Sequence, residues 1–186
     1  MADAHKKTRH RLFVALSVPQ AHASKLSACR DEHIRARWTS PQQYHLTLQF
    51  IGYVDTDHRS AIAEALRHIH AKRFTLEVSG IGAFPSPRQP RVIVAFVCPN
   101  DRLAHLQQAV VHALSGVGIE PEARPFKAHL TLARLKDTGA RQIQSYLHEH
   151  EDFHLKPFRV SMFHLYESTL HPTGAVYQQI ETYPLV

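Results

Sequence analysis

The sequence predicts an α+β fold made of two similar lobes, with one functional site between them. The tetrapeptide His-Leu-Thr-Leu occurs at His45–Leu48 and again at His129–Leu132, 84 positions later (129 − 45 = 84). Both copies lie where apolar and polar residues alternate, which is typical of half-buried strands. Each copy also follows a segment with helical periodicity, so the order of elements is similar in the two halves of the chain.

The first predicted elements are a strand and a helix. Leu12–Leu16 is an apolar run that ends before Pro19, as a short buried strand would. From Gln20 to about Arg35, apolar residues recur with loose helical spacing, and no Pro or Gly interrupts them. We therefore expect a helix over this segment.

The segment 44–51 alternates between apolar and polar residues up to Gly52. On a strand, alternation places one set of side chains toward the core and the other set on the opposite face. The predicted core-facing side chains are Leu46, Leu48 and Phe50. The predicted opposite face carries His45, Thr47 and Gln49.

The middle of the chain is predicted to contain a surface helix and two strands. Asp57 can cap a helix that runs to about Lys72. Phe74–Val78 and Arg91–Val97 have the composition of strands. The three prolines between these strands lack a backbone donor and predict an irregular loop. They are Pro85, Pro87 and Pro90.

The second half of the chain repeats the order of the first. Asn100 or Asp101 caps a predicted helix that Gly116 and Gly118 close. The apolar stripe of this helix is Leu103, Leu106, Val110 and Leu114.

The second alternating strand, 128–135, comes after that helix. A short helix near 141–148 and two further strands, 158–166 and 176–182, complete the chain. If the two halves are related by a pseudo-two-fold axis, both histidine strands face one cleft.

Composition is that of an ordinary globular protein, and we expect residues 1–186 to form a single domain of two duplicated lobes. The chain is 44% hydrophobic and 20% charged. Its net charge of +6 and pI near 9.5 would attract polyanions such as nucleic acid, although no basic block dominates. Nothing in the composition requires oligomerisation, so a monomer is expected.

Cysteine usage indicates a reducing compartment. Cys29 and Cys98 are far apart and form no Cys-x-x-Cys pair, so neither a disulfide framework nor a thiolate zinc site is indicated. The apolar run after the basic start is too short for a signal peptide, and no segment has the length of a transmembrane helix. We expect a cytoplasmic protein that is not associated with a membrane.

Chance must be weighed against the repeated motif, because 16 His and 10 Thr predict about one accidental His-x-Thr. A third copy, His171-Pro172-Thr173, contains Pro and precedes Gly174, so we interpret it as an accidental match in a turn. The other two copies share four identical residues on predicted strands.

Two histidines and two threonines in one cleft suit phosphoester hydrolysis. One neutral imidazole can take a proton from water, and an imidazolium can give one to the departing ribose oxygen. The two hydroxyls can hold the non-bridging phosphate oxygens. The reference pKa of histidine, about 6.5, makes both protonation states accessible at neutral pH.

The chain resembles the 2H phosphoesterase superfamily, and within it the bacterial and archaeal RNA 2′,3′-cyclic phosphodiesterases, once called 2′-5′ RNA ligases. The stretches that carry this resemblance are Arg11-Leu12-Phe13-Val14-Ala15-Leu16, Trp38 to Gly52, Gly80-Ile81-Gly82-Ala83-Phe84, Pro90-Arg91-Val92, Arg124-Pro125-Phe126 to Arg134, Leu165-Tyr166-Glu167-Ser168 and Gly174 to Tyr177. It implies two lobes of antiparallel sheet, with outer helices, around a central cleft.

The resemblance also implies an activity, in which a cyclic phosphate at an RNA end is opened to a 2′-phosphomonoester without a cofactor or metal. By position, His45 is the proton donor and His129 the proton acceptor, while Thr47 and Thr131 hold the phosphate. Arg134 matches a family arginine near the phosphate. Lys127-Ala128 departs from the family, which often has a proline next to the second histidine.

Aromatic and histidine-rich segments offer two further sets of candidate binding residues. Five aromatic residues could stack a nucleobase, although we expect at least three of them in the core and favour Phe126 as the stacking residue. The five are Trp38, Tyr44, Phe50, Phe126 and Tyr166. The histidine-rich segments 68–70 and 148–154 have no defined metal-ligand spacing, so no metal site is predicted.

Three functions remain compatible with the residues. The first is metal-independent hydrolysis of cyclic phosphates at RNA ends. The second uses the same site for ligation or for small cyclic or 2′-5′ nucleotides. The third is a non-catalytic nucleotide-binding module, which intact histidines and threonines in both motifs disfavour.

Overall fold

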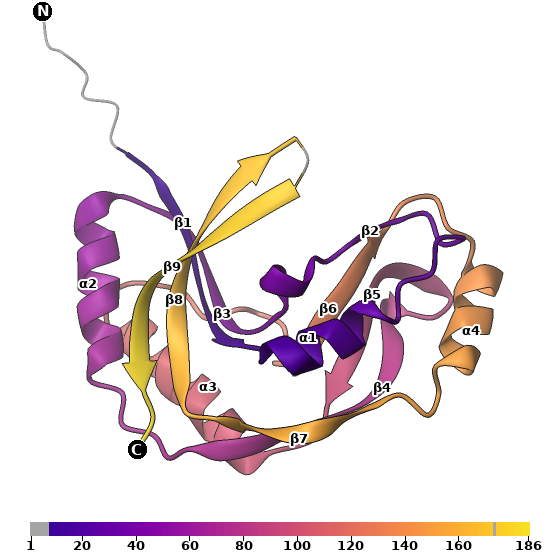
Figure 1. The fold of residues 1–186 in the computed structure, drawn as a ribbon. Coiled ribbons are helices and arrows are strands. Elements are labelled where there is room, and N and C mark those ends of the chain that lie inside the picture. Colours follow the sequence, from indigo (N-terminus) through magenta and orange to yellow (C-terminus); the bar gives the residue numbers. More distant parts are fainter. Residues whose placement is uncertain (1–7, 173) are drawn as a thin grey trace, which may run out of the picture.

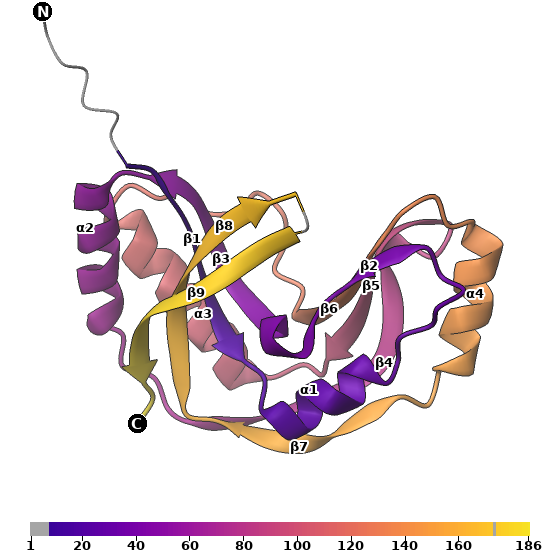
Figure 2. The same cartoon turned by 45° about the horizontal axis from the view of Figure 1, so that its top comes forward.

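The structure, a computed structural model, describes residues 8–172 and 174–186 and consists of two antiparallel sheets that form two lobes (Figure 1). The four-stranded sheet has the order β3-β1-β8-β9, and the five-stranded sheet has the order β2-β6-β5-β4-β7. The α-helices lie outside the two sheets (Figure 2). The predicted α+β fold is confirmed. Thr173 and the basic residues at positions 5–7 lie outside the described residues.

The lobes do not coincide with the halves of the chain. The four-stranded sheet joins two early strands to two late ones: β1 (His10–Ser17), β3 (His45–Val54), β8 (Met162–His171) and β9 (Gly174–Pro184). The five-stranded sheet contains β2 (Ala36–Trp38), β4 (Phe74–Ser86), β5 (Gln89–Val97), β6 (His129–Leu135) and β7 (His154–Val160). The repeated element order is therefore folded into interleaved lobes rather than into consecutive ones.

Two helices each follow a strand of one lobe and pack against the other lobe. The helices are α1 (Gln20–Ser27), the short 3-10 helix η1 (Pro41–Gln43), α2 (Thr56–Arg67), α3 (Asp101–Ser115) and α4 (Ala140–Glu149). Helix α1 follows β1, yet His22 Nε2 lies 2.9 Å from the Lys156 carbonyl oxygen in β7. Helix α3 follows β5, yet it lies beside α2, and Gln107 donates to the Leu48 carbonyl in β3. These crossings tie the two lobes together.

The predicted α3 is confirmed in its cap and in its apolar stripe. Asn100 is the N-cap, and its side chain accepts a hydrogen bond from the Leu103 amide at 3.0 Å. All four predicted stripe residues are buried. No helix in residues 8–172 and 174–186 is long and apolar enough to cross a membrane.

The first predicted helix is shorter than expected. It ends at Ser27 instead of near Arg35, and β2 forms at Ala36–Trp38, where no strand was predicted. The Asp31 side chain accepts a hydrogen bond from the His33 amide at 2.8 Å. Such local side-chain bonds compete with helical backbone bonds and favour a turn.

The second predicted helix has a different cap and an earlier end. Asp55, not Asp57, is the N-cap, because the Asp55 carboxylate accepts from the His58 amide at 2.9 Å. Asp57 lies in the first turn, where a carboxylate is still favourable near the positive end of the helix dipole. The helix ends at Arg67 rather than near Lys72.

The predicted proline-rich loop is instead a hairpin. Strand β4 continues to Ser86, and β5 begins at Gln89, so the two strands pair along the segment expected to be irregular. Pro85 faces Pro90 in this pairing. Because the two prolines face each other, the backbone N–H groups that they lack affect one position of the strand pairing instead of two.

The predicted strand 158–166 is two strands in different sheets. Val160 ends β7 and pairs with Phe74 in the five-stranded sheet, whereas Phe163 in β8 pairs with Tyr183 in the four-stranded sheet. The chain passes between lobes at Ser161. Both strands contain buried apolar residues. The spacing of these residues in the sequence indicates burial, but it does not reveal which sheet each strand joins.

Candidate active site

The two histidine strands, β3 and β6, lie next to each other where the lobes meet. In both motifs the histidine and threonine are partly exposed and the two leucines are buried. The alternation predicted for the motifs is therefore confirmed within them. One cleft of about 620 Å³ is lined by His45, Thr47, His129 and Thr131 together.

Both imidazole rings are held in the same way. His45 Nδ1 lies 2.7 Å from the Gln43 carbonyl oxygen, and His129 Nδ1 lies 2.6 Å from the Lys127 carbonyl oxygen. A carbonyl only accepts, so Nδ1 carries the hydrogen in each ring. Nε2 is then the nitrogen that can take or give a proton.

The surroundings of the two rings differ. His45 packs against Phe13, at 5.0 Å between ring centroids, and edge-on against Tyr177 at 5.1 Å. His129 meets Phe84 edge-on at 5.1 Å. Burial lowers the pKa of His45, the hydrogen bond to Gln43 opposes this, and the nearby charges of His129 and Arg134 lower it further.

A β-bulge brings Arg134 to the cleft. Thr131 pairs with Val94 and Ala133 with Ile93, so Leu132 is an extra residue in β6. The bulge shifts the alternation by one position, and Arg134 lines the same cleft as His129 and Thr131. The structure thus brings the predicted arginine to the predicted cleft.

The same bulge occurs in β3 and reverses the burial of the residues after the first motif. Thr47 pairs with Ala15 and Gln49 with Val14, so Leu48 is the extra residue. Gln49 is consequently buried, and Phe50 is 37% exposed. The prediction that Phe50 faces the core and Gln49 faces away was wrong because alternation was counted through the bulge.

A second groove of about 1030 Å³ adjoins the cleft and shares Thr47 and His129 with it. Phe126, 37% exposed, lies in this groove and not in the first cleft. Phe50 and Phe84 line the same groove. Three aromatic rings therefore lie beside the histidine pair, on one side of it.

The expectation that at least three of the aromatic candidates lie in the core was wrong: of the remaining three, Tyr44 belongs to the core, Trp38 packs against it, and Tyr166 is not part of it. Tyr44 is buried, and Trp38 and Tyr166 are partly buried. Tyr166 stacks on Phe13 at 5.1 Å. Trp38 also lines the cleft.

Phe50 was predicted as a possible stacking residue, but on the core-facing side of its strand. Its exposed position has a signal in the sequence, because Phe50 follows its motif histidine by five positions (50 − 45), as Arg134 does (134 − 129). Sequence reasoning missed two residues that line the cleft, Arg37 in β2 and Tyr177 in β9. Neither has a spacing signal, because each side chain reaches the cleft only in the folded chain.

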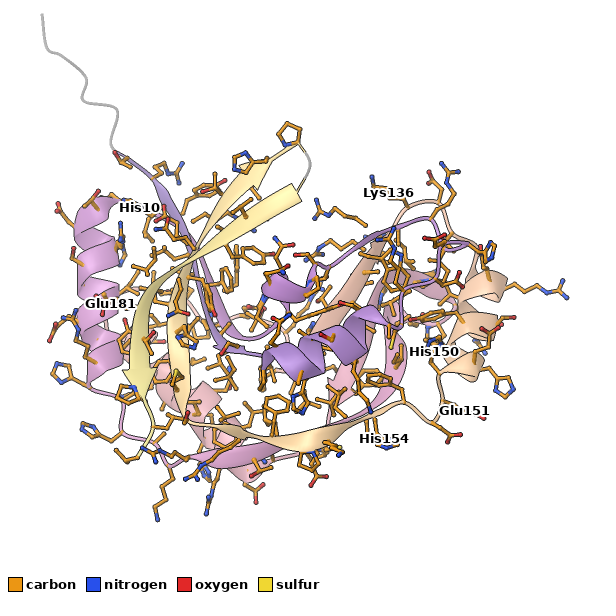
Figure 3. All side chains as sticks on the ribbon, in the orientation of Figure 1. His10, Lys136, His150, Glu151, His154 and Glu181 are labelled. Atoms are coloured by element: carbon orange, nitrogen blue, oxygen red, sulfur yellow. The ribbon has the colours of Figure 1, made fainter. Side chains whose placement is uncertain are left out.

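The histidine-rich segments lie on the outside of the molecule. His148 Nδ1 is 3.1 Å from Glu151, and Figure 3 shows Glu151 and His154 at the outer surface where α4 leads into β7. His68 contacts Glu64 on α2 at 3.4 Å. Within the part of the chain that the structure describes, no three His, Cys, Asp or Glu side chains are grouped to hold a metal ion.

Comparison with known proteins gives a consistent family. The sequence profile described as LigT-like phosphoesterase matches residues 16–94 and 97–177. A protein from Aeropyrum pernix named RNA 2′,3′-cyclic phosphodiesterase is 35% identical over 143 residues, which cover 75% of this chain and 80% of the relative. A protein of the same name from Thermotoga maritima is 33% identical over 179 residues, which cover 90% and 91%.

Solved structures share the fold. The crystal structure of TT0787 from Thermus thermophilus superposes with a TM-score of 0.78 at 25% identity, covering 94% of this chain and 97% of that one. Escherichia coli LigT in complex with 3′-AMP superposes with a TM-score of 0.74 at 21% identity, covering 96% and 99%.

Proposed function

The chain belongs to the LigT-like phosphoesterases, the 2H family, and from this premise we propose that it hydrolyses 2′,3′-cyclic phosphates at RNA ends to 2′-phosphomonoesters. The observation that carries the proposal is the matched pair of histidines. Each ring is fixed through Nδ1 to a main-chain carbonyl, and each stands two residues before a threonine in one cleft. The named activity of the 33–35% identical relatives supports the same reaction.

In the proposed reaction, a water molecule attacks the phosphorus of the cyclic phosphate. His129 Nε2 takes the proton of that water while the new P–O bond forms. The P–O3′ bond breaks, and His45 gives its Nε2 proton to O3′. The phosphate stays on O2′, so the product is a 2′-phosphomonoester with a free 3′-hydroxyl.

The threonines and Arg134 stabilise the charge on the phosphate. Thr47 and Thr131 line the cleft beside the histidines, and their hydroxyls donate to the non-bridging oxygens. The Arg134 guanidinium presents a fixed set of donors to the same oxygens. All three groups act most strongly in the transition state, when negative charge on the oxygens is greatest.

Burial suits His45 to the role of donor. A lowered pKa makes the imidazolium a stronger acid, which favours transfer of its proton to the departing oxygen. The phosphate anion of a bound substrate favours the protonated ring. Substrate binding would thus favour the protonated form of His45, which burial disfavours in the free protein.

The second groove would hold the nucleobase. Phe126 and Phe50 are exposed there and offer ring faces on which a base can stack. The net charge of +6 would attract the RNA. Both lobes contribute to this one site, so we propose that residues 1–186 form one domain. We also propose that the protein is a monomer and that it lies in the cytoplasm, where Cys29 and Cys98 would stay reduced.

The test is hydrolysis of a synthetic RNA oligonucleotide that ends in a 2′,3′-cyclic phosphate, in the presence of EDTA. The proposal expects ring opening at an undiminished rate, because the two histidines supply the proton transfers. An intact substrate with correctly folded protein would refute the activity. Loss of turnover in EDTA, restored by a divalent ion, would refute the metal-free chemistry.

A further inference from the structure

Arg37 and Arg134 stand opposite each other in neighbouring strands. Strand β2 pairs with β6 so that Arg37 faces Arg134. Main-chain hydrogen bonds lie on both sides of this pair. The Lys136 amide donates to the Arg35 carbonyl at 2.7 Å, and the Thr39 amide donates to the Leu132 carbonyl at 2.8 Å. Opposed residues of an antiparallel pair project to the same face, with Cα atoms about 5 Å apart. Two guanidinium groups therefore enter one cleft side by side.

Arg37 has no anionic partner in the part of the chain that the structure describes. No hydrogen bond or ion pair joins its side chain to another described residue, and it is exposed at the cleft. It extends toward the β8–β9 hairpin of the other lobe, where a Cβ built on Gly174 would lie 3.4 Å from Arg37 Nη1. An unpaired guanidinium between the lobes, within a phosphate site, offers a planar set of donors for a further phosphate.

The two arginines occupy inner and outer positions. Arg134 is in β6, the strand that carries His129 and Thr131, and it lines the cleft with them. Arg37 lies across from it in β2, against the Gly174 turn. An RNA end has a second phosphate close to the cyclic one, namely the phosphodiester on the 5′ side of the terminal nucleotide.

We propose that Arg37 binds this 5′ phosphodiester and thereby makes the enzyme prefer the end of an RNA chain to a free cyclic mononucleotide. The inference rests on the proposed function, because it takes the cyclic phosphate to lie between His45 and His129. Arg37 is then a specificity-determining residue and takes no part in proton transfer. Its contribution is confined to substrates that carry a second phosphate.

The experiment compares two substrates, a diadenosine with a terminal 2′,3′-cyclic phosphate and adenosine 2′,3′-cyclic monophosphate. The wild-type protein should have the higher kcat/KM for the dinucleotide. Arg37→Ala should lower that value about tenfold, mainly through KM, as loss of one charged hydrogen-bonding contact predicts. The same variant should hydrolyse the mononucleotide within about twofold of the wild-type rate. Arg37→Lys should keep part of the preference, because the charge remains without the planar fork.

A neutral methylphosphonate in place of the internal phosphodiester identifies the atom group involved. It should lower kcat/KM of the wild-type protein about tenfold and leave kcat/KM of the Arg37→Ala variant unchanged. Arg141→Ala, which removes an exposed arginine of α4, is the matched control for general electrostatic attraction and should keep the dinucleotide preference.

Equal losses on both substrates, or full sensitivity of Arg37→Ala to the methylphosphonate, would overturn the role of Arg37 while the hydrolysis itself stands. A wild-type protein without preference between the two substrates would overturn it as well. Absence of hydrolysis of either substrate would instead contradict the proposed function.

Discussion

Phe50 and Arg134 occupy equivalent positions in the two lobes. Each follows its motif histidine by five residues (50 − 45 and 134 − 129), and a bulge at the second leucine of each motif brings each one to the surface. Phe50 lines the second groove, and Arg134 lines the cleft. The same backbone arrangement thus presents an aromatic ring on one side of the histidine pair and a cation on the other. The ring suits a base, and the cation suits a phosphate.

Replacement of Phe50 should weaken substrate binding more than catalysis. Arg11 covers one face of the ring at 4.5 Å, which supports the ring as a platform for a base in the groove. Phe50→Ala should raise KM about tenfold, because stacking of one base contributes roughly 1–3 kcal/mol. Steady-state kinetics with a cyclic-phosphate dinucleotide measure this. Tyr53→Ala, which removes another exposed ring of β3, should leave KM unchanged. An unaltered KM for Phe50→Ala would exclude stacking at this ring.

His45→Ala and His129→Ala should each lower kcat by about 10²–10⁴-fold, because each removes one proton transfer. The double variant should be little worse than either single one, since the two groups act in one step. Circular dichroism should show an unchanged fold. His68→Ala, on the exposed end of α2, is the control and should keep full activity. A variant of His45 or His129 with the wild-type rate would remove that residue from the mechanism.

Thr47→Val and Thr131→Val should each lower kcat/KM about tenfold or more, because a hydrogen bond to a charged group contributes roughly 1.5–3 kcal/mol. Valine keeps the shape of threonine and replaces the hydroxyl with a methyl group. Thr47→Ser and Thr131→Ser should recover most of the activity, since serine restores the donor. Serine variants as slow as the valine variants would point to packing instead of phosphate binding.

His45 should titrate below the ordinary histidine value of 6.5 in the free protein. Burial lowers its pKa, so the imidazolium forms only when the pH falls beneath the usual range. A bound 2′-phosphomonoester should raise the midpoint, because an anion stabilises the charged ring. Tyr177→Ser should also raise it by admitting water to the ring edge. NMR titration of the His45 ring measures all three, and a free-protein midpoint at or above 6.5 would contradict the burial argument.

The sequence predicted the elements that depend on local pattern. The two alternating motifs placed histidine and threonine on one face of each strand, and the stripe from Leu103 to Leu114 placed the buried side of α3. The start of α3 was also predicted, with Asn100 or Asp101 as the cap, because the capping hydrogen bond reaches only three residues along the chain. These features involve near neighbours, so near neighbours in the sequence reveal them.

The features that were not predicted depend on distant partners. The bulges at Leu48 and Leu132 appear only in the pairing with β1 and β5, so a count along one strand misplaced Phe50. Strand β2 is three residues long and exists because β6 offers it an edge. Its absence from the prediction is why Arg37 was overlooked. The same limit hid the change of sheet at Ser161.

The most direct test of the central claim is the identity of the product. An RNA oligonucleotide with a 2′,3′-cyclic phosphate end is hydrolysed in ¹⁸O-labelled water, and the product is analysed by ³¹P NMR. If His129 activates water and His45 protonates O3′, the product is a 2′-phosphomonoester carrying one ¹⁸O atom. A 3′-phosphomonoester would contradict the assigned geometry of the histidine pair.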